Sequence, residues 1–569
     1  MTAASAGLPA EAVLPSTLDP LTLGGLLAGS AARFGDATAI VSGDRSISFR
    51  QLASSALRVA SGLAAADVGK GTRVGLLMPN GIDWVITAFG VGLSGAVLVP
   101  LSTFATGAEL SELLRHSDVE VLLLQSSFLH HQYLDELVER YPTIGQEHSG
   151  AIYCRELPYL RRAFALDLRT ARGGVEPWSS LIEGGESFPE DVVLARAREV
   201  KTADDGIIIY TSGTSAEPKG VLHCHRSPVL QSWRWAEQMR LGTSDRAWGD
   251  MPLFWSAGFA KMLGSSLVAG ARLYLEGGAF DQRHAANLLA TERITVVHAP
   301  SHHVAAIADA VADLDLNVSS LRNVEPGALA KAAGLPEDHP HPNAAYGMTE
   351  CFTIVTSLPS DAPIELRRST HGRPLPGCDV AIVNSETSER CAVGEYGEIA
   401  VRGIVLMKGY YKKLPEESFD ADGFYHTGDA GYLDGDGYLH WTGRSSNLIK
   451  TGGANVSPLE IEYDLAAMGL RHVAVIGVPH PTLGEAVVAC AVPAGGKPID
   501  EAALRADLRT RHAAYKVPLR FVTFTEEEVP LTASGKSKRD ELRLRVIERL
   551  ATDNRDPAWQ QFLKSWAEA

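Results

Sequence analysis

The stretch "YTSGTSAEPKG", residues 210–220, concentrates hydroxyl-bearing residues, two glycines and a lysine in eleven positions. Hydroxyl groups and free backbone N–H groups bind anionic oxygens, so this composition favours a phosphate-binding loop. A Walker P-loop is excluded, because Lys219 follows Pro218 instead of glycine and leads into "GVLHCH", which is typical of a strand. The stretch therefore predicts a bend between two strands that offers the hydroxyls of Thr211, Ser212, Thr214 and Ser215.

Four further motifs stand downstream in a fixed order and carry groups that suit nucleotide chemistry. They are "YGMTE" (346–350), with an aromatic ring, a hydroxyl and a carboxylate; "YHTGDAGYLDGDGYLHWTGR" (425–444), with Asp429 and Arg444; "KTGGANVSPLEIE" (450–462), a glycine bend; and "PLTASGKSKRDEL" (530–542), with Lys536. Taken singly, each is more often a solvated acid, a turn residue or a surface charge. Only the five motifs together, in this order, are specific.

The elements that must position these residues follow from the apolar pattern. Strand-like runs at 72–79 and 96–101 flank a helical pattern at 81–95, and further strand-like runs follow at 119–125, 207–210, 271–276 and 294–300. Such alternation is typical of parallel βαβ units, so we expect at least two α/β lobes.

The texture of the chain changes after Leu358. Short alternating runs punctuated by Gly, Asp and Pro predict a small β-rich module around 365–442. The remainder has the pattern of a compact α+β domain. We place the boundary near Gly443 and Arg444, which predicts an N-terminal domain over 1–443 and a C-terminal domain over 444–569.

Composition excludes several classes of partner. The chain has 52 Lys+Arg against 68 Asp+Glu, a formal charge of −16, which repels nucleic acid and anionic membranes. The six cysteines lack a CxxC pair, so neither a zinc site nor a disulfide framework is expected. We find no signal-peptide pattern and no run near the ~20 apolar residues of a membrane span. These features predict a cytoplasmic protein.

With its five ordered motifs the chain resembles the adenylate-forming superfamily, which contains acyl-CoA synthetases, luciferases and the adenylation domains of peptide synthetases. The resemblance runs from "SFRQLASSALRVASGL" (48–63) to "RDELR" (539–543). It implies an α/β fold: a large N-terminal domain of two α/β lobes plus a small β-barrel, then a small mobile α+β C-terminal domain. It also implies that ATP activates a carboxylic acid to an acyl-AMP and that the acyl group then passes to a thiol, usually that of coenzyme A.

The resemblance implies roles on the nucleotide side. Phosphate contacts fall to Thr211, Ser212, Gly213, Thr214, Ser215 and Lys219 for the β- and γ-phosphates, and to Thr349 for the α-phosphate. Glu350 would hold Mg²⁺ between phosphate oxygens. Tyr346 would stack on adenine beside Gly327, Ala328 and Gly347, while Asp429, helped by Arg444, would accept from the ribose hydroxyls.

Other roles implied by the resemblance belong to the acyl group, the thiol and the hinge. Lys536 would bridge the acyl carboxylate and the phosphate, and Ser446 stands at the hinge. Gly452 and Gly453 would line the coenzyme A channel, where a side chain would obstruct a thin ligand. For the acyl pocket we expect Trp255, Ser256, Ala257, Gly258 and Met348, together with the small Gly347. The small residues favour a roomy apolar pocket, although they also fit close packing of elements.

Three departures from the family pattern bear on ATP and the hinge. Ala216 stands where the loop usually carries glycine, and "VEPGALA" (324–330) places Pro326, which has no N–H to donate, on the nucleotide side. Ser446 replaces the usual hinge acid or lysine.

A cluster of five histidines could suggest a metal site, but no HExxH motif accompanies it. These are His223, His225, His298, His302 and His303.

Three functions stay open. The first is an acyl-CoA ligase that uses ATP, Mg²⁺ and coenzyme A on a medium, long or bulky cyclic acid. The second is an enzyme of the same fold that mainly thioesterifies a supplied acyl-AMP, with a separate adenylating partner, or that loads a carrier protein; the chain shows no appended carrier domain, which favours free coenzyme A. The third, a non-catalytic acyl-nucleotide binding protein, fits poorly because Lys536 and Glu350 are present. A homodimer is also left open.

Overall fold

The computed structural model of the protein describes residues 20–146, 150–211, 218–342, 344–384, 387, 389–444, 447, 449–451, 454–493, 499–512, 514–531, 537–553 and 555–568. These residues divide into two compact units. The first unit takes in the chain up to Val380 and Val401–Tyr425, and the second takes in Ala381–Ala400 and His426–Ala569. The predicted boundary near Gly443 and Arg444 stays a prediction.

An eight-stranded sheet forms one lobe of the first unit, in the order β18-β9-β8-β4-β3-β5-β6-β7. In chain order its strands are β3 (Arg73–Leu77), β4 (Val97–Pro100), β5 (Val121–Leu124), β6 (Arg162–Ala165), β7 (Val175–Pro177), β8 (Asp205–Thr211), β9 (Lys219–Cys224) and β18 (Gly409–Tyr410). The strands from β8 to β7 run parallel, whereas β9 pairs antiparallel with both β8 and β18.

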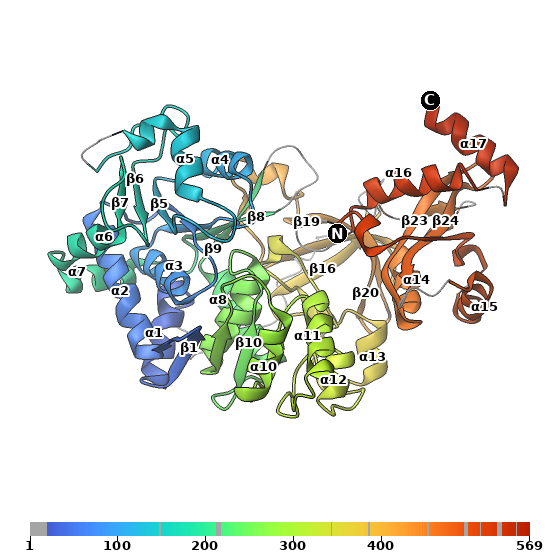
Figure 1. Ribbon diagram of the computed structural model, residues 1–569, viewed down its shortest axis with the longest axis horizontal. Coiled ribbons are helices and arrows are strands. Elements are labelled where there is room, and N and C mark those ends of the chain that lie inside the picture. The colour runs from blue at the N-terminus through green and yellow to red at the C-terminus, as the bar shows by residue number, and fades with distance from the viewer. Residues whose placement is uncertain are drawn as a thin grey trace, which may run out of the picture. The chain divides into compact units, whose positions relative to one another are not determined.

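Both faces of this sheet are buried, because successive side chains of a strand point to opposite sides. On β5, Val121 and Leu123 join the core with α1, α2 and α3, whereas Leu122 and Leu124 join a second core with α4 and α5. Figure 1 shows α4 and α5 on one side of these strands and α2 and α3 on the other. The helices are α1 (Leu23–Phe34), α2 (Phe49–Ala65), α3 (Ile82–Ser94), α4 (Gly107–His116), α5 (Tyr133–Arg140), α6 (Trp178–Glu186) and α7 (Glu190–Glu199).

A five-stranded sheet in the order β12-β10-β11-β1-β2 forms the second lobe. It is also buried on both faces, since Ala247 of β10 packs with α8 and the π-helix η3 while Trp248 packs with α10 and α11. Its strands are β1 (Thr38–Ser42), β2 (Arg45–Ser48), β10 (Arg246–Gly249), β11 (Arg272–Leu275) and β12 (Val296–His298). Its helices are α8 (Arg226–Gln238), η3 (Gly258–Gly264), α9 (Ser265–Ala269), α10 (Gln282–Thr291), α11 (Ser301–Asp313) and α12 (Ala328–Ala332).

Strands occupy much of the stretch around 365–442, and the β-rich module predicted there stays a prediction. A three-stranded sheet joins β13 (Ala345–Tyr346), β14 (Thr356–Ser357) and β15 (Arg373–Pro374), which α13 (Ile364–Ser369) interrupts. A four-stranded sheet follows the order β16-β17-β19-β20, with β16 (Cys378–Val383), β17 (Gly397–Gly403), β19 (Tyr425–Leu433) and β20 (Leu439–Arg444). A closed barrel stays a prediction. One strand of the stretch, β18, instead extends the eight-stranded sheet through β9.

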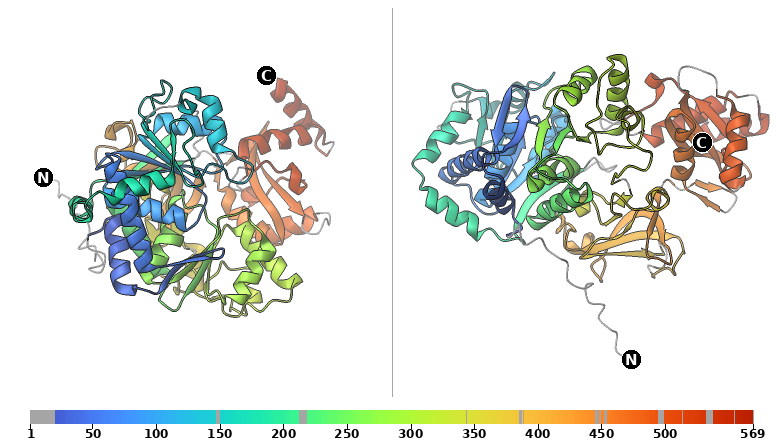
Figure 2. Two further views of the ribbon diagram at one scale, coloured as in Figure 1. Left: turned by 60° about the vertical axis from the view of Figure 1, so that its left-hand side comes forward. Right: turned by 90° about the horizontal axis from the view of Figure 1, so that it is seen from below.

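The second unit has the α+β composition that the sequence predicts. Strands β21 (Ile449–Thr451), β22 (Ala454–Val456), β23 (Leu470–His480), β24 (Gly484–Pro493) and β25 (Arg520–Thr523) form its sheet. Helices α16 (Arg539–Leu550) and α17 (Pro557–Glu568) cover one face, and α14 (Pro458–Ala467) and α15 (Glu501–Arg511) cover the other. Figure 2 shows these orange to red elements from two further sides.

The predicted alternation of strands and helices is confirmed over both lobes. The run at 72–79 contains β3, the helical pattern at 81–95 contains α3, and the run at 207–210 lies within β8. All six cysteines are unpaired. In the part of the chain that the structure describes, no helix is long and apolar enough to cross a membrane.

Buried histidines predict how the first unit responds to acid. Burial lowers the pKa of His223 and of His225 to about 4, and that of His298 to about 3, from an ordinary value of 6.5. Below pH 6.5 the unfolded chain therefore binds more protons than the folded chain does. Stability is full above pH 6.5 and falls as the pH drops from 6.5 towards 4, by at most about 1.4 kcal/mol per pH unit for each proton.

We expect the urea midpoint, followed by tryptophan fluorescence, to fall over this pH window, and to fall less steeply in His225→Asn. His130→Asn, which changes an exposed histidine, is the matched control and should keep the wild-type slope. An unchanged slope in His225→Asn would contradict the assignment, whatever that variant's stability at pH 8.

Candidate functional site

The predicted phosphate loop joins two antiparallel strands. Thr211, the last residue of β8, pairs directly with Lys219, the first residue of β9. The loop between them includes Ser212, Gly213, Thr214, Ser215, Ala216 and Glu217, which lie outside the described residues. No helix follows Lys219, so the bend between two strands is confirmed and a Walker P-loop is excluded on structural grounds as well.

The segment that carries Thr349 and Glu350 is held by its backbone. After β13 the chain makes one 3₁₀ turn, η4 (Thr349–Cys351), and then enters the left-handed region at Phe352, where φ is 59°. Nε2 of Gln231 in α8 donates to the carbonyl oxygens of Cys351 and Ile354, both at 2.7 Å. Because Gln231 is fully buried, its two hydrogen bonds act as a clamp on the backbone of the turn.

A buried histidine completes the clamp. His223 Nε2 lies 2.7 Å from the carbonyl oxygen of Thr349, and its ring meets that of Phe352 edge-on with centroids 5.1 Å apart. Burial lowers the pKa of His223 to about 4, so the imidazole is neutral at pH 7. We therefore assign the ring hydrogen to Nε2, which donates to Thr349. A bulky residue with positive φ is unfavourable, and here the packed ring of Phe352 sustains it.

The carboxylate of Glu350 is oriented by two tyrosines. The hydroxyl of Tyr410 donates to Glu350 Oε1 at 2.7 Å and lies 2.8 Å from the hydroxyl of Tyr425, which is 3.4 Å from the same carboxylate oxygen. Burial, and then the Glu350 charge, raise the pKa of Tyr410, so its hydroxyl keeps the proton it donates. Nζ of Lys219 lies 5.7 Å from the centre of the Tyr410 ring. Tyr410 thus connects the phosphate-loop lysine with the predicted metal carboxylate.

The arrangement of Glu350 suits Mg²⁺. Its oxygen Oε1 is engaged by tyrosine hydroxyls, whereas Oε2 forms no hydrogen bond with any described residue. Mg²⁺ prefers hard oxygen ligands and is usually bound by one or two carboxylates together with substrate phosphates. Glu350 could therefore hold the ion through Oε2 while the tyrosines fix the carboxylate plane.

Two glycines of the predicted acyl pocket are required by packing. A Cβ on Gly258 would overlap the carbonyl oxygen of Pro252, and a Cβ on Gly347 would overlap that of Thr353. Both distances would be well below 3.0 Å, which real Cβ atoms essentially never show. Close backbone approach therefore explains glycine at these positions. Their proposed part in the pocket stays a prediction.

The other predicted pocket residues surround the start of η3. Trp255 is half-buried, with its ring centroid 6.5 Å from that of Phe104 and 5.9 Å from that of Phe254. Ser256 is buried, and Ala257 precedes η3 directly. Met348 is half-buried between β13 and η4. A π-helix such as η3 is rare and is often found at functional sites.

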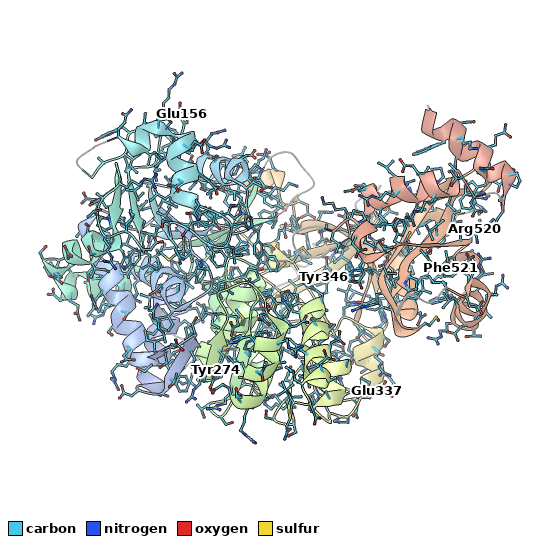
Figure 3. The ribbon with its side chains drawn as sticks, in the orientation of Figure 1. Glu156, Tyr274, Glu337, Tyr346, Arg520 and Phe521 are labelled. Atoms are coloured by element: carbon cyan, nitrogen blue, oxygen red, sulfur yellow. The ribbon has the colours of Figure 1, made fainter. Side chains whose placement is uncertain are left out.

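The predicted adenine contacts come from two places in the first unit. Tyr346, labelled in Figure 3, is buried and pairs with Thr356 of β14. Gly327 and Ala328 are exposed at the start of the short helix α12, where Gly327 accepts a backbone hydrogen bond from Lys331. Their contact with adenine stays a prediction.

The second unit brings Asp429 and Arg444 together. They face each other across the antiparallel pair β19 and β20, and Nε of Arg444 lies 3.0 Å from Asp429 Oδ1. Arg444 also donates through Nη1 to the carbonyl oxygen of Thr427 at 2.7 Å. The Asp429 side chain is 7% exposed and that of Arg444 is 54% exposed. A guanidinium this close forms an ion pair with the carboxylate and limits the ways in which it can turn.

Four predicted residues lie outside the described part of the second unit. Gly452 and Gly453 fall between Thr451 and Ala454, which pair across β21 and β22. Lys536 falls between Leu531 and Ser537, which form an isolated antiparallel bridge. Ser446 follows β20.

The histidines of the sequence cluster serve different parts of the first unit. His223 supports Thr349, and Nδ1 of His225 accepts from Leu23 N at 3.4 Å. Nδ1 of His303 lies 2.5 Å from Asp250 Oδ2. Among the described residues, no group of three His, Cys, Asp or Glu side chains could hold a metal ion.

Sequence comparison places this geometry in a known family. Residues 27–411 match the AMP-binding enzyme family, and residues 465–536 match its C-terminal domain. The chain therefore belongs to the AMP-binding enzymes, which are adenylate-forming. The resemblance drawn from its five motifs is confirmed.

Its relatives are coenzyme A ligases. A Mycobacterium tuberculosis CoA ligase named for a 7a-methyl-1,5-dioxo-octahydro-1H-inden-4-yl propanoyl group is 32% identical over 89% of this chain and 96% of its own length. A feruloyl-CoA synthase from Amycolatopsis sp is 32% identical over 90% of this chain and 96% of its own.

A solved coenzyme A ligase has a similar structure. The anthranilate CoA ligase AuaEII in complex with anthranoyl-AMP superposes with a TM-score of 0.74, at 25% identity over 92% of this chain and 97% of that one. Family and relatives identify the chain as an ATP-dependent, AMP-forming acid–thiol ligase of the acyl-CoA synthetase type, which uses ATP and coenzyme A.

Tyr410→Phe removes the hydroxyl that orients Glu350, so the carboxylate should become a poorer metal ligand. A hydrogen bond to a charged group contributes about 1.5–3 kcal/mol. We therefore expect the Mg²⁺ concentration for half-maximal pyrophosphate release to rise about 10-fold or more. The matched control is Tyr411→Phe, whose hydroxyl donates to Asp118 instead. If Tyr410→Phe and Tyr411→Phe titrate alike with Mg²⁺, the positioning role is wrong.

Proposed function

We propose that the chain joins a bulky cyclic or a medium- to long-chain carboxylic acid to coenzyme A through an acyl-AMP intermediate. The observation that carries the proposal is the cluster around Tyr410, where Glu350 and Lys219 meet one aromatic ring. Relatives named for an indenyl propanoyl and a feruloyl group, and a structural neighbour holding anthranoyl-AMP, support a cyclic acid. A cytoplasmic setting and a homodimer belong to the proposal as points to test.

In the first half-reaction two anions must approach each other. A carboxylate oxygen of the acid attacks the α-phosphorus of ATP, the bond to the β-phosphate bridge oxygen breaks, and pyrophosphate leaves with the bond electrons. Lys219 and the loop from Thr211 to Ser215 would offset charge on the β- and γ-phosphates, and Thr349 would donate to the α-phosphate. Mg²⁺ held by Glu350 would add fixed positive charge there. Tyr346 would stack on adenine, beside Gly327, Ala328 and Gly347.

Roles in the second unit complete the proposal. Asp429, paired with Arg444, would accept from both ribose hydroxyls. Lys536 would lie between the acid's carboxylate and the α-phosphate as a point charge. In the second half-reaction the thiolate of coenzyme A attacks the acyl carbonyl and AMP leaves, with Gly452 and Gly453 lining the thiol's path. The C-terminal domain carries both Lys536 and the segment with Gly452 and Gly453. Rotation near Ser446 would therefore move the lysine away from the acyl group and bring the glycine segment to it.

A second candidate is an enzyme that mainly thioesterifies a supplied acyl-AMP. It is favoured by Ala216 and Glu217 in the phosphate loop and by Pro326, which precedes Gly327 without an N–H to donate. Acyl-AMP lacks the β- and γ-phosphates, so a weakened loop penalises ATP far more than the adenylate. Such an enzyme would depend on a separate adenylating partner.

Lys536→Ala should abolish acyl-AMP formation while transfer from supplied acyl-AMP to coenzyme A stays largely intact. Losing one fixed cation at the transferring centre costs on the order of 10²-fold in rate or more. Gly453→Leu is the reciprocal variant and should block thioester formation while sparing ATP–pyrophosphate exchange. Equal damage to both steps by Lys536→Ala would show that the lysine does not act in one half-reaction alone.

The two candidates differ in how they respond to repair of the loop. If adenylation is impaired, Ala216→Gly should raise pyrophosphate exchange, and neutralising Glu217 should raise it further. The acyl-AMP to coenzyme A rate should stay within about threefold, because the adenylate does not contact the loop. Robust exchange by the wild type would remove the second candidate and leave the two-step ligase.

A further inference from the structure

Lys261 is a lysine of the π-helix η3 that has no anionic partner. It lies three residues after Gly258, and its Nζ is 5.1 Å from the centre of the Trp235 ring of α8. Among the described residues it makes no hydrogen bond and no ion pair. Burial lowers the pKa of Lys261, and the Glu325 carboxylate only partly opposes this. Lys261 is half-buried, and no described carboxylate forms an ion pair with it, so its charge is left for a ligand to neutralise.

His298, the last residue of β12, is a second unsatisfied group. It is 1% exposed, and neither Nδ1 nor Nε2 has a hydrogen-bond partner within the described part of the chain. Burial, and then the Lys261 charge, lower its pKa to about 3, so at pH 7 it is neutral and carries one unused N–H donor. A buried donor left unpaired costs about 1–3 kcal/mol.

His298 and η3 are neighbours across Gly249. Gly249 pairs with His298 in the parallel ladder of β10 and β12. A Cβ on Gly249 would lie 3.0 Å from Cβ of His298 and would overlap Sδ of Met262, the residue after Lys261. The lysine and the histidine therefore belong to one neighbourhood, which agrees with the influence of Lys261 on the pKa of His298.

His341 is a further histidine with a nitrogen unused by the described residues. It is buried, and its Nδ1 lacks a partner among the residues that the structure describes. Burial, followed by Lys261, His339 and His298, lowers its pKa to about 2. By contrast, His339 is satisfied, since its nitrogens lie 2.9 Å from the carbonyl oxygens of Pro336 and Val324.

The neighbourhood adjoins the catalytic turn. Nε1 of Trp235, whose ring lies under Lys261, donates to Thr353 Oγ1 at 3.1 Å. The carbonyl oxygen of Thr353 is in turn the group against which Gly347 packs. In the sequence, η3 continues directly from the predicted acyl residues Trp255 to Gly258. The unsatisfied groups therefore stand where the acyl segment leads away from Thr349 and Glu350.

Internal partners do not account for these groups. Glu325, the carboxylate that influences Lys261, accepts from Ser301 Oγ at 3.0 Å and forms no ion pair with the lysine. A metal ion is disfavoured beside a lysine cation. One ammonium and neutral imidazoles that offer donors are instead matched by a ligand with several acceptor oxygens and a negative charge.

We propose that Lys261 and His298 form a subsite that binds a second carboxylate, distant from the one that is activated, so that the substrate is a dicarboxylic acid. This inference rests on the proposed function of the same site. The second carboxylate forms an ion pair with Lys261 Nζ and accepts from the N–H of His298, which neutralises the lysine and satisfies the buried imidazole at once. A plain hydrocarbon tail would leave Lys261 and His298 unpaired, so we expect it to be the poorer substrate.

The test compares acids of equal length in the coenzyme A thioester assay: an unbranched monocarboxylic acid, its ω-carboxylate counterpart and its ω-methyl-ketone counterpart, over six to twelve carbons. The wild type should prefer the best dicarboxylic acid at least 10-fold in kcat/KM. Lys261→Met should lose about 10-fold or more on that acid, because it removes the cation that pairs with the ω-carboxylate, and no more than threefold on the monocarboxylic acid. Lys331→Met, at an exposed lysine of α12, is the matched control.

A charge reversal sharpens the test. Lys261→Glu should reject the dicarboxylic acid and accept an ω-amino acid of the same length. Equal use of the three acids by the wild type, a preference for the ketone, or equal losses on all acids in Lys261→Met would each overturn the inference. Absence of thioester from every acid would instead overturn the proposed function, whereas thioester from monocarboxylic acids alone would leave that function standing.

A binding measurement on the wild type guards against variants that do not fold. Non-hydrolysable acyl-sulfamoyl adenosines, with and without the ω-carboxylate, are titrated by calorimetry. The ω-carboxylate should tighten binding at least 10-fold, and Lys261→Arg, which keeps the charge, should retain most of that gain. No gain in the wild type would overturn the subsite independently of turnover.

Discussion

The site depends on the hydrogen bonds that hold the backbone of one short turn. Thr349 and Glu350 lie on a single 3₁₀ turn that ends in the left-handed conformation of Phe352, and such a turn is unfavourable by itself. His223 and Gln231, both fully buried, bind the carbonyl oxygens of Thr349, Cys351 and Ile354. These bonds leave the hydroxyl and carboxylate side chains of the turn available for ligands, because the backbone alone satisfies the clamp.

The electrostatics of the molecule make such local positioning necessary. With a formal charge of −16 the protein as a whole repels ATP and a carboxylate substrate. Attraction must come from a few fixed groups, and Lys219 and Glu350 are placed relative to each other by the ring and hydroxyl of Tyr410. In the second unit Arg444 does the same for Asp429. Glu350 and Asp429 thus each have a neighbour that limits their direction, as preorganised sites require.

The sequence predicts the elements well where local pattern decides them. The parallel strands, α3 and the bend between β8 and β9 all follow from apolar periodicity and from the order of glycine and proline. Tyr410 could not be found in this way, because its role arises only when β18 pairs with β9, nearly two hundred positions earlier. The same holds for His223, a strand residue whose partner lies on a distant turn.

Two further features depend on contacts that appear only in the folded chain. Small residues at 258 and 347 suggest a roomy pocket. In the fold, both positions also require glycine, because a side chain would overlap the backbone of Pro252 or Thr353. Lys261 belongs to no motif, and its importance appears only in the fold, where it lies beside Trp235 and forms no ion pair with any described residue. Packing and satisfaction of buried charge are properties of the folded chain, so periodicity and motif spacing do not contain them.

The central claim is that a carboxylate attacks the α-phosphorus of ATP at this site. The most direct measurement uses an acid labelled with ¹⁸O in its carboxylate, together with ATP, Mg²⁺ and coenzyme A, followed by ³¹P NMR of the products. The account predicts AMP that carries one ¹⁸O, in equal amount to the pyrophosphate and the thioester formed. Label found in inorganic phosphate beside ADP, or thioester formed with unlabelled AMP, would contradict it.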